Sequence, residues 1–143
     1  MYPAIISALG VRPAAGRLIA PDDDRPGAAP AVTISYSLWQ RRFASSDAAI
    51  GKSILINGKS FVIAGVSAPE FFGVRPQGAP VVFIPMHDLG LVDLNRYGDV
   101  AARFIDPHFY WIEMMGRLKS GIGLQRAGAA IGGAISSRGR KHG

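Results

Sequence analysis

Apolar positions along the chain fall into short runs, separated by segments rich in proline, glycine and aspartate. The run Ala31–Tyr36 is rich in β-branched residues and predicts a strand. Two further runs, Ser53–Ile56 and Ser60–Val66, are joined across Asn57-Gly58-Lys59, and Asn-Gly supplies the positive φ angles of a type I′ turn. These runs predict a β-hairpin. Because both are apolar almost throughout, we expect part of the hairpin to be covered on both faces.

A short helix is predicted between the first strand and the hairpin. Ser35 or Ser37 is suited to the N-cap position, and the helix would continue to Phe43. Its spacing places three large apolar side chains on one side and two arginines on the other. The apolar residues are Leu38, Trp39 and Phe43, and the outward ones are Arg41 and Arg42.

The later elements have weaker patterns. Pro80–Pro85 predicts a short strand, and Phe109–Leu118 predicts another. Met86–Asp106 is mixed, with room for a turn or two of helix. Apolar residues at helical spacing predict a helix from about Leu124 to Ile135, although each interior glycine costs about 1 kcal/mol relative to alanine. The two segments predicted as loops are Ala20–Pro30 and Pro69–Gly78.

The composition indicates a globular chain of one domain or two small lobes. The 143 residues are 48% hydrophobic and 18% charged, which argues against wholesale disorder. Eighteen glycines and ten prolines favour short elements. The absence of cysteine excludes disulfides, thiolate metal sites and a cysteine nucleophile. No apolar stretch is long enough to predict a transmembrane helix, and the N-terminal residues do not predict a signal peptide.

The net charge of +6 is confined to the C-terminal part of the chain. Up to Glu113, ten basic residues balance ten acidic ones. A neutral body with a basic tail is a poor footprint for nucleic acid, which needs a positive face on the folded part. We therefore expect no nucleic-acid partner and a solvated terminus. The six basic residues beyond Glu113 are Arg117, Lys119, Arg126, Arg138, Arg140 and Lys141.

Two motifs could bind phosphate or metal, and both fail on spacing. Gly51-Lys52-Ser53 ends like a phosphate-binding loop, but Ser46 stands where the first glycine should be and Ser53 opens a predicted strand. Asp22-Asp23-Asp24 is contiguous, whereas a calcium loop alternates its ligands. We expect a turn at Gly51 and a solvated turn or helix start at Asp22-Asp23-Asp24, and the sequence predicts no metal or cofactor.

Candidates for acid–base chemistry are His87 beside Asp88 and His108 beside Asp106. No Gly-x-Ser-x-Gly elbow supplies a nucleophile. A histidine in a proline-flanked loop is usually a surface hydrogen-bonding residue, so no catalytic residue is predicted. The aromatic residues are dispersed among the predicted elements and are expected to anchor a core.

An ordered series of segments resembles the MacB-like periplasmic core domain. This is the extracytoplasmic module of one branch of ABC-transporter permeases, and the resemblance is closest to the large duplicated bacterial type. It extends from about Leu9 to Ile135 and rests on order and spacing rather than on any single motif. The segments are LGVRPAAGR (9–17), ISYSLWQRRF (34–43), IGKS (50–53), LINGKSF (55–61), IAGV (63–66), PEFFG (69–73), FIP (83–85) and GRLKSG (116–121).

The resemblance implies an α+β fold of two lobes. A sabre-like, β-rich lobe with short helices would span 11–86, a connecting segment 87–107, and the returning strand and helix of a porter-like α/β lobe 108–137, before a basic tail at 138–143. Such modules carry no catalytic residues and bind no nucleotide. The implied partners are the transmembrane helices of the permease and a separate ABC ATPase, with a homodimer possible, on the extracytoplasmic side of the cell membrane.

The chain departs from this family pattern because such permeases have one transmembrane helix before the domain and three after it. We therefore expect a fragment that lacks the transmembrane helices and part of the porter-like lobe. Two other hypotheses stay open. One is a free-standing β-rich binding module that uses its basic tail on nucleic acid or anionic lipid, and the other is an enzyme that uses His87 or His108.

Overall fold

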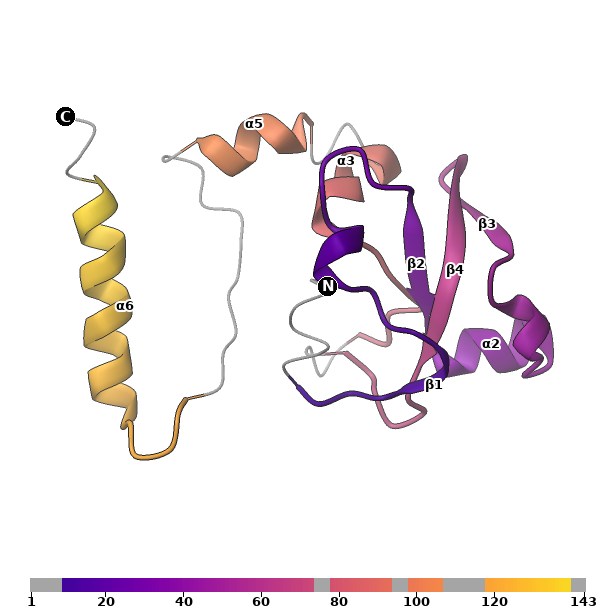
Figure 1. Cartoon of the computed structure of the whole chain (residues 1–143), viewed down its shortest axis with the longest axis horizontal. Helices are drawn as coiled ribbons and strands as arrows, with labels where there is room; N and C mark the ends of the chain where they lie inside the picture. The colour runs from indigo at the N-terminus through magenta and orange to yellow at the C-terminus, as the bar shows by residue number, and fades with distance from the viewer. Residues whose placement is uncertain (1–8, 74–77, 94–97, 107–117, 140–143) are drawn as a thin grey trace. The chain divides into compact units, whose positions relative to one another are not determined.

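The structure is a computed structural model, and it describes residues 9–73, 78–93, 98–106 and 118–139. The chain divides into two compact units, Met1–Phe104 and Ile105–Gly143. The first unit holds the strands and the short helices, and the second holds one longer helix (Figure 1). The described elements confirm the predicted α+β class.

The first unit contains a five-stranded mixed sheet together with short helices and 3-10 turns. The sheet strands are β1 (Pro13–Gly16), β2 (Ala31–Ile34), β3 (Ser53–Ile56), β4 (Lys59–Ser67) and β5 (Val82–Phe83). The helices and turns are η1 (Pro21–Asp23), α2 (Tyr36–Phe43), η2 (Asp47–Ala49), η3 (Met86–Asp88), α3 (Leu89–Val92) and α5 (Val100–Ile105), the last of which reaches the boundary between the units.

Strand β4 organises the sheet because three other strands pair with it. β3 and β1 pair antiparallel with successive parts of β4, opposite Lys59–Val62 and Gly65–Ser67. β2 pairs with it in parallel, and β5 pairs antiparallel with β2. The register of β2 against β4 skips Ala64, whose carbonyl accepts a hydrogen bond from the backbone N–H of Arg17 at 3.0 Å. Ala64 is therefore the extra residue of a β-bulge in the β2–β4 pairing, and it lies where Arg17, the first residue after β1, contacts β4.

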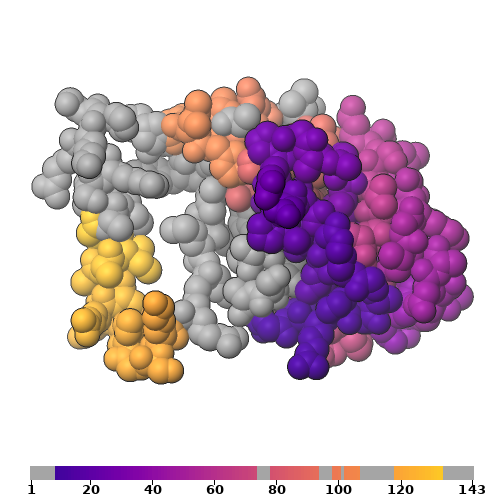
Figure 2. Space-filling view, in the orientation of Figure 1, coloured from indigo at the N-terminus to yellow at the C-terminus, as the bar shows by residue number. Residues whose placement is uncertain are grey.

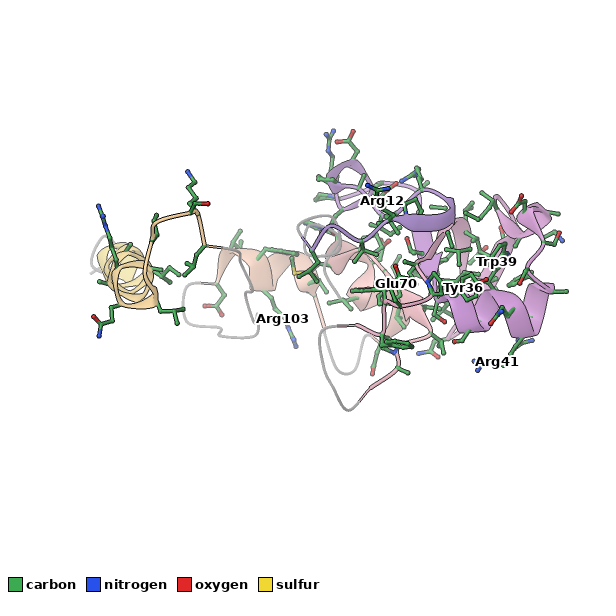
Figure 3. All side chains as sticks on the ribbon, turned by 90° about the horizontal axis from the view of Figure 1, so that it is seen from below. Arg12, Tyr36, Trp39, Arg41, Glu70 and Arg103 are labelled. Carbon is green, nitrogen blue, oxygen red and sulfur yellow. The ribbon has the colours of Figure 1, made fainter. Side chains whose placement is uncertain are left out.

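Helix α2 forms as the sequence predicted. Ser35 is the N-cap, and its hydroxyl accepts a hydrogen bond from the Leu38 N–H at 3.2 Å. The indole of Trp39 is buried and donates to the carbonyl of Ser46 at 2.9 Å. Tyr36 meets Trp39 edge to face at 5.6 Å, whereas Arg41 points away from the core (Figure 3). The buried core comprises Val32, Ile34, Trp39, Ala49, Phe61, Ile63 and Val66.

The predicted hairpin is confirmed, and Asn57 and Gly58 both have positive φ angles, 49° and 79°, as a type I′ turn requires. Its two ends differ in burial. The run Gly65–Ser67 is buried on both faces of the sheet, as expected for part of the hairpin, because α2 and the segment after β1 lie against it. Toward the tip, Leu55 is 75% exposed and Val62 is 41% exposed.

Other predictions were less accurate. β1 was not predicted, since its sequence Pro-Ala-Ala-Gly has no strand pattern. The strand expected at 80–85 is reduced to the two residues of β5. The mixed segment 86–106 contains η3, α3 and α5. The strand expected at 109–118 lies almost wholly outside the described residues.

The second unit contributes α6 (Leu124–Gly139), which begins where the spacing predicted. Gly121, in the turn before it, has a φ of +81°. Leu124 is 81% exposed and Ile131 is 55% exposed, so apolar side chains on this helix face outward within the unit.

Candidate functional site

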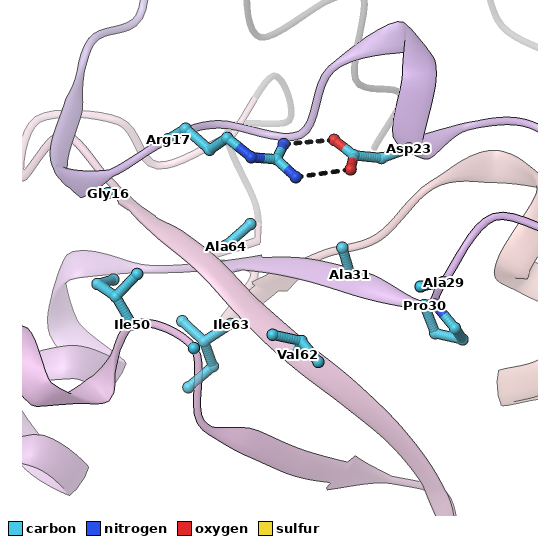
Figure 4. A pocket seen from close by; sticks show the side chains of 11 residues that line it. Gly16, Arg17, Asp23, Ala29, Pro30, Ala31, Ile50, Val62, Ile63 and Ala64 are labelled. Carbon is cyan, nitrogen blue, oxygen red and sulfur yellow. Dashed lines mark hydrogen bonds and ion pairs between the residues drawn. The ribbon is translucent and has the colours of Figure 1, made fainter.

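An open groove of about 610 Å³ lies on the sheet of the first unit. Val62, Ile63 and Ala64 of β4 line it together with Ala31 of β2, which is paired with Val62 (Figure 4). The segment that follows β1 forms one wall, and Figure 2 shows this segment on the surface of the first unit. Ile19 fixes the segment, because its buried N–H donates to the Thr33 hydroxyl at 3.1 Å. Apart from Arg17 and Asp23, the residues that line the groove are apolar or glycine.

An ion pair bounds this groove. The guanidinium of Arg17 donates to both carboxylate oxygens of Asp23, at 2.6 and 2.8 Å (Figure 4). The backbone N–H of Ala20 also donates to the carboxylate, at 2.7 Å. The hydrogen bond from Arg17 holds the pKa of Asp23 below its usual value, and the same contact raises the pKa of Arg17. A second pair, Arg25 with Asp22, is far more exposed.

We expect Arg17→Gln to lower the free energy of unfolding by roughly 1 kcal/mol near neutral pH. A bidentate pair with a half-buried carboxylate contributes more to stability than an ordinary surface ion pair does. The depressed pKa of Asp23 gives stability that is present above the ordinary carboxyl pKa and is lost as the pH falls through the folded-state value. The difference from the unsubstituted chain should therefore shrink below about pH 4. Urea unfolding at several pH values measures it.

The control for that experiment is Arg25→Gln, which removes an exposed ion pair of the same type. We expect this control to change stability by less than about 0.5 kcal/mol. If the two substitutions lowered the free energy of unfolding equally, the Arg17–Asp23 pair would contribute no more to stability than an exposed ion pair does.

A second cluster joins residues that are far apart in the sequence. The Asp24 carboxylate accepts a hydrogen bond from the backbone N–H of His87 and contacts its Nδ1, both at 2.9 Å, across 63 residues. The imidazole stacks on Phe104 with ring centroids 4.3 Å apart. Asp88 is only 8% exposed, and its Oδ2 has no hydrogen-bond partner among the residues that the structure describes. Sequence adjacency had suggested Asp88 as the partner of His87, whereas the structure pairs His87 with Asp24.

The carboxyl group of Asp88 has a strongly perturbed pKa. Burial raises its pKa to about 6, and repulsion from Asp24 adds to this effect. His87 partly opposes the increase, and Asp23 contributes a further small increase. A carboxyl group that titrates near neutrality can exchange a proton, but among the described residues no hydroxyl nucleophile is hydrogen-bonded to His87.

The remaining sequence candidates lie apart from both features or outside the description. Gly51 has a φ of +82° and donates to the carbonyl of Ile63, so Gly51-Lys52-Ser53 is a turn that leads into β3, as expected. His108 lies outside the described residues. Within 9–73, 78–93, 98–106 and 118–139, no three His, Asp or Glu side chains are arranged to hold a metal ion. Arg138 falls in α6, and residues 140–143 lie outside the description.

The described residues thus define an α+β domain with an apolar groove on its sheet and a neighbouring ionic cluster. The chain belongs to the MacB-like periplasmic core domain family, whose sequence pattern matches residues 1–134. Domains of this family form the periplasmic part of ABC-transporter permeases. The resemblance inferred from the ordered segments is therefore confirmed. No curated protein shows a significant match to the chain.

None of the helices in the described residues has both the length and the apolar character needed to cross a bilayer.

Proposed function

We propose that this chain is the part of a MacB-type permease that passes ATP-driven motion to a substrate or partner outside the membrane, without chemistry of its own. The observation that carries the proposal is the family match over residues 1–134. The ATP would be hydrolysed by a separate ABC ATPase, and transmembrane helices of the permease would connect the two. We include a homodimer of the permease and an extracytoplasmic location at the cell membrane in the proposal.

The construction of the first unit supports a mechanical role. β4 pairs with three strands, and its C-terminal end, Gly65–Ser67, is buried on both faces, so a force applied to one strand is shared across the sheet. The Asp24–His87 pair and the hydrogen bond from the Ile19 N–H to Thr33 connect the segment after β1 to the rest of the unit. Close-packed interiors transmit displacement because they deform little.

We also propose the lobe boundaries that the resemblance implies. Residues 11–86 would be the sabre-like lobe, 87–107 the connection and 108–137 the porter-like part. The basic tail at 138–143 would lie near the bilayer, where lysine and arginine gain affinity for anionic headgroups. Nucleic acid is not a partner in this proposal.

The extracytoplasmic location is tested with an epitope tag that is encoded in the natural gene and inserted at Gly121 of the protein. This glycine is exposed, lies in a turn and has open space around it. In spheroplasts treated with protease, we expect the tag to be cleaved while a cytoplasmic marker stays intact. The tagged protein should sediment with membranes and be retained with an ABC ATPase after detergent extraction.

A tag that is cleaved only after lysis would contradict the extracytoplasmic location. DNA binding that weakens with salt and disappears when residues 138–143 are deleted would instead favour the binding-module hypothesis. Turnover of an ester substrate that is lost with His87→Ala would favour an enzyme.

A further inference from the structure

Three segments of the first unit meet at the ionic cluster. Asp24 follows η1, His87 and Asp88 belong to η3, and Phe104 lies near the end of α5. We name these four residues the acid clamp. Its contacts are the Asp24–His87 pair and the stack of His87 on Phe104, whose ring planes are inclined by 13°.

We propose that the acid clamp is a pH-sensitive device that holds α5 on the first unit in mildly acidic conditions and loosens it near neutral pH. Two observations carry this inference. The buried Oδ2 of Asp88 has no hydrogen-bond partner within the described part of the chain, and His87 lies between Asp24 and Phe104.

The charges around Asp88 explain why its ionisation is unfavourable. Asp24 and Asp23 approach from the segment after β1, and both repel a carboxylate at this position. His87, on the same turn, attracts it. α3 is followed by Asp93, and α5 contributes Arg103 with Asp99 preceding it. An ionised Asp88 would be a third negative charge beside Asp23 and Asp24. Its burial also deprives the ionised carboxylate of the water that would stabilise it.

The direction of the pH effect follows from the raised pKa of Asp88. An unfolded chain releases this proton near the ordinary carboxyl pKa, whereas the folded chain keeps it up to about pH 6. The stabilising effect of the bound proton is complete below the ordinary pKa and is lost as the pH rises through the folded value. Asp88 adjoins His87 in η3, so the charge that Asp88 gains as the pH rises appears beside the residue that holds Phe104.

α5 depends on this clamp because it is a single short helix. A helix of this length is unstable in isolation and needs tertiary contacts. Val100 is 6% exposed and anchors the N-terminal end, beside Gly90. Phe104 stacks on His87 at the other end. Loss of the His87 stack would therefore release the end of α5 nearest the boundary between the two units.

The experiment measures amide hydrogen exchange of the full chain at about pH 5 and pH 7.5, corrected for the intrinsic rates. We expect the Arg103 amide, which donates to the Asp99 carbonyl at 3.2 Å, to be protected about tenfold more at the lower pH. In Asp88→Asn, whose amide does not ionise, this ratio should fall below about threefold. Asp47→Asn, at an exposed aspartate in η2, is the matched control and should behave as the unsubstituted chain.

A titration of carboxyl carbons labelled with ¹³C gives an independent measurement that needs no folded variant. We expect Asp88 to show a midpoint near 6, as its pKa indicates. A midpoint below about 5, equal protection of the Arg103 amide at both pH values, or an unchanged ratio in Asp88→Asn would each overturn the inference. These outcomes concern the isolated chain, so they are independent of the proposed location. Only the use of the clamp to sense the pH outside the membrane rests on the proposed function.

Discussion

Replacing Gly65 with alanine is expected to destabilise the first unit by at least about 3 kcal/mol, a large part of the stability of a typical domain. An added Cβ would lie 2.1 Å from the carbonyl oxygen of Arg17 and 2.6 Å from its nitrogen. Both atoms belong to the backbone, so no side-chain rotation relieves the overlap. The chain after β1 would have to lift from β4, which also loosens the Arg17–Asp23 pair.

Urea unfolding followed by circular dichroism measures this effect. The matched control is Gly78→Ala, because Gly78 belongs to the same unit and has open space where the new methyl group would lie. We expect the control to stay within about 0.5 kcal/mol of the unsubstituted chain. If Gly65→Ala destabilised the unit no more than the control does, the backbones of Gly65 and Arg17 would not lie as close together as the structure places them.

Phe61→Ala is the second substitution with a large expected effect. The Phe61 side chain is completely buried, and it packs in the core beside Val32, Ile63 and Trp39. Removing a buried phenyl ring leaves a cavity and typically costs about 3–5 kcal/mol. Phe72→Ala is the matched control, since this phenylalanine is 67% exposed, and we expect less than about 1 kcal/mol for it.

The same pair of variants also tests the mechanical role. In a permease assembled with its ATPase, Phe61→Ala should reduce transport for each ATP hydrolysed, because a loosened sheet transmits less displacement. Phe72→Ala should leave that ratio unchanged. If the domain of the Phe61→Ala protein were shown to be unfolded and transport for each ATP hydrolysed were still unchanged, the proposal that this domain passes on the motion would be wrong.

The elements that the sequence predicted well are those specified locally. The Asn57-Gly58 turn sets its own φ angles, and Ser35 caps α2 with an oxygen three residues from the N–H that it accepts. β1 is different, because Pro13–Gly16 forms a strand only through pairing with Gly65–Ser67, and no residue within it favours one. β5 likewise depends on β2, which explains why the predicted strand at 80–85 was too long.

The site residues follow the same division. The sequence singled out Asp22-Asp23-Asp24 and His87, but it could not assign their partners. Asp24 meets His87 only because the sheet brings η1 and η3 together across 63 residues. The burial of Asp88 is equally a product of the fold. The six-residue spacing of Arg17 and Asp23 was a usable signal, since a turn between oppositely charged residues favours their pairing.

The parallel alignment of β2 and β4 imposes an order on folding. Residues 35–58, which hold α2, η2 and β3, must be spanned before these two strands meet, whereas the β3–β4 hairpin needs only its own turn. Closing the longer span is entropically more demanding, and non-local pairing slows folding. We therefore expect the hairpin to nucleate, β2 to join in the rate-limiting step, and β1 to be captured last, once β4 offers a free edge at Gly65–Ser67.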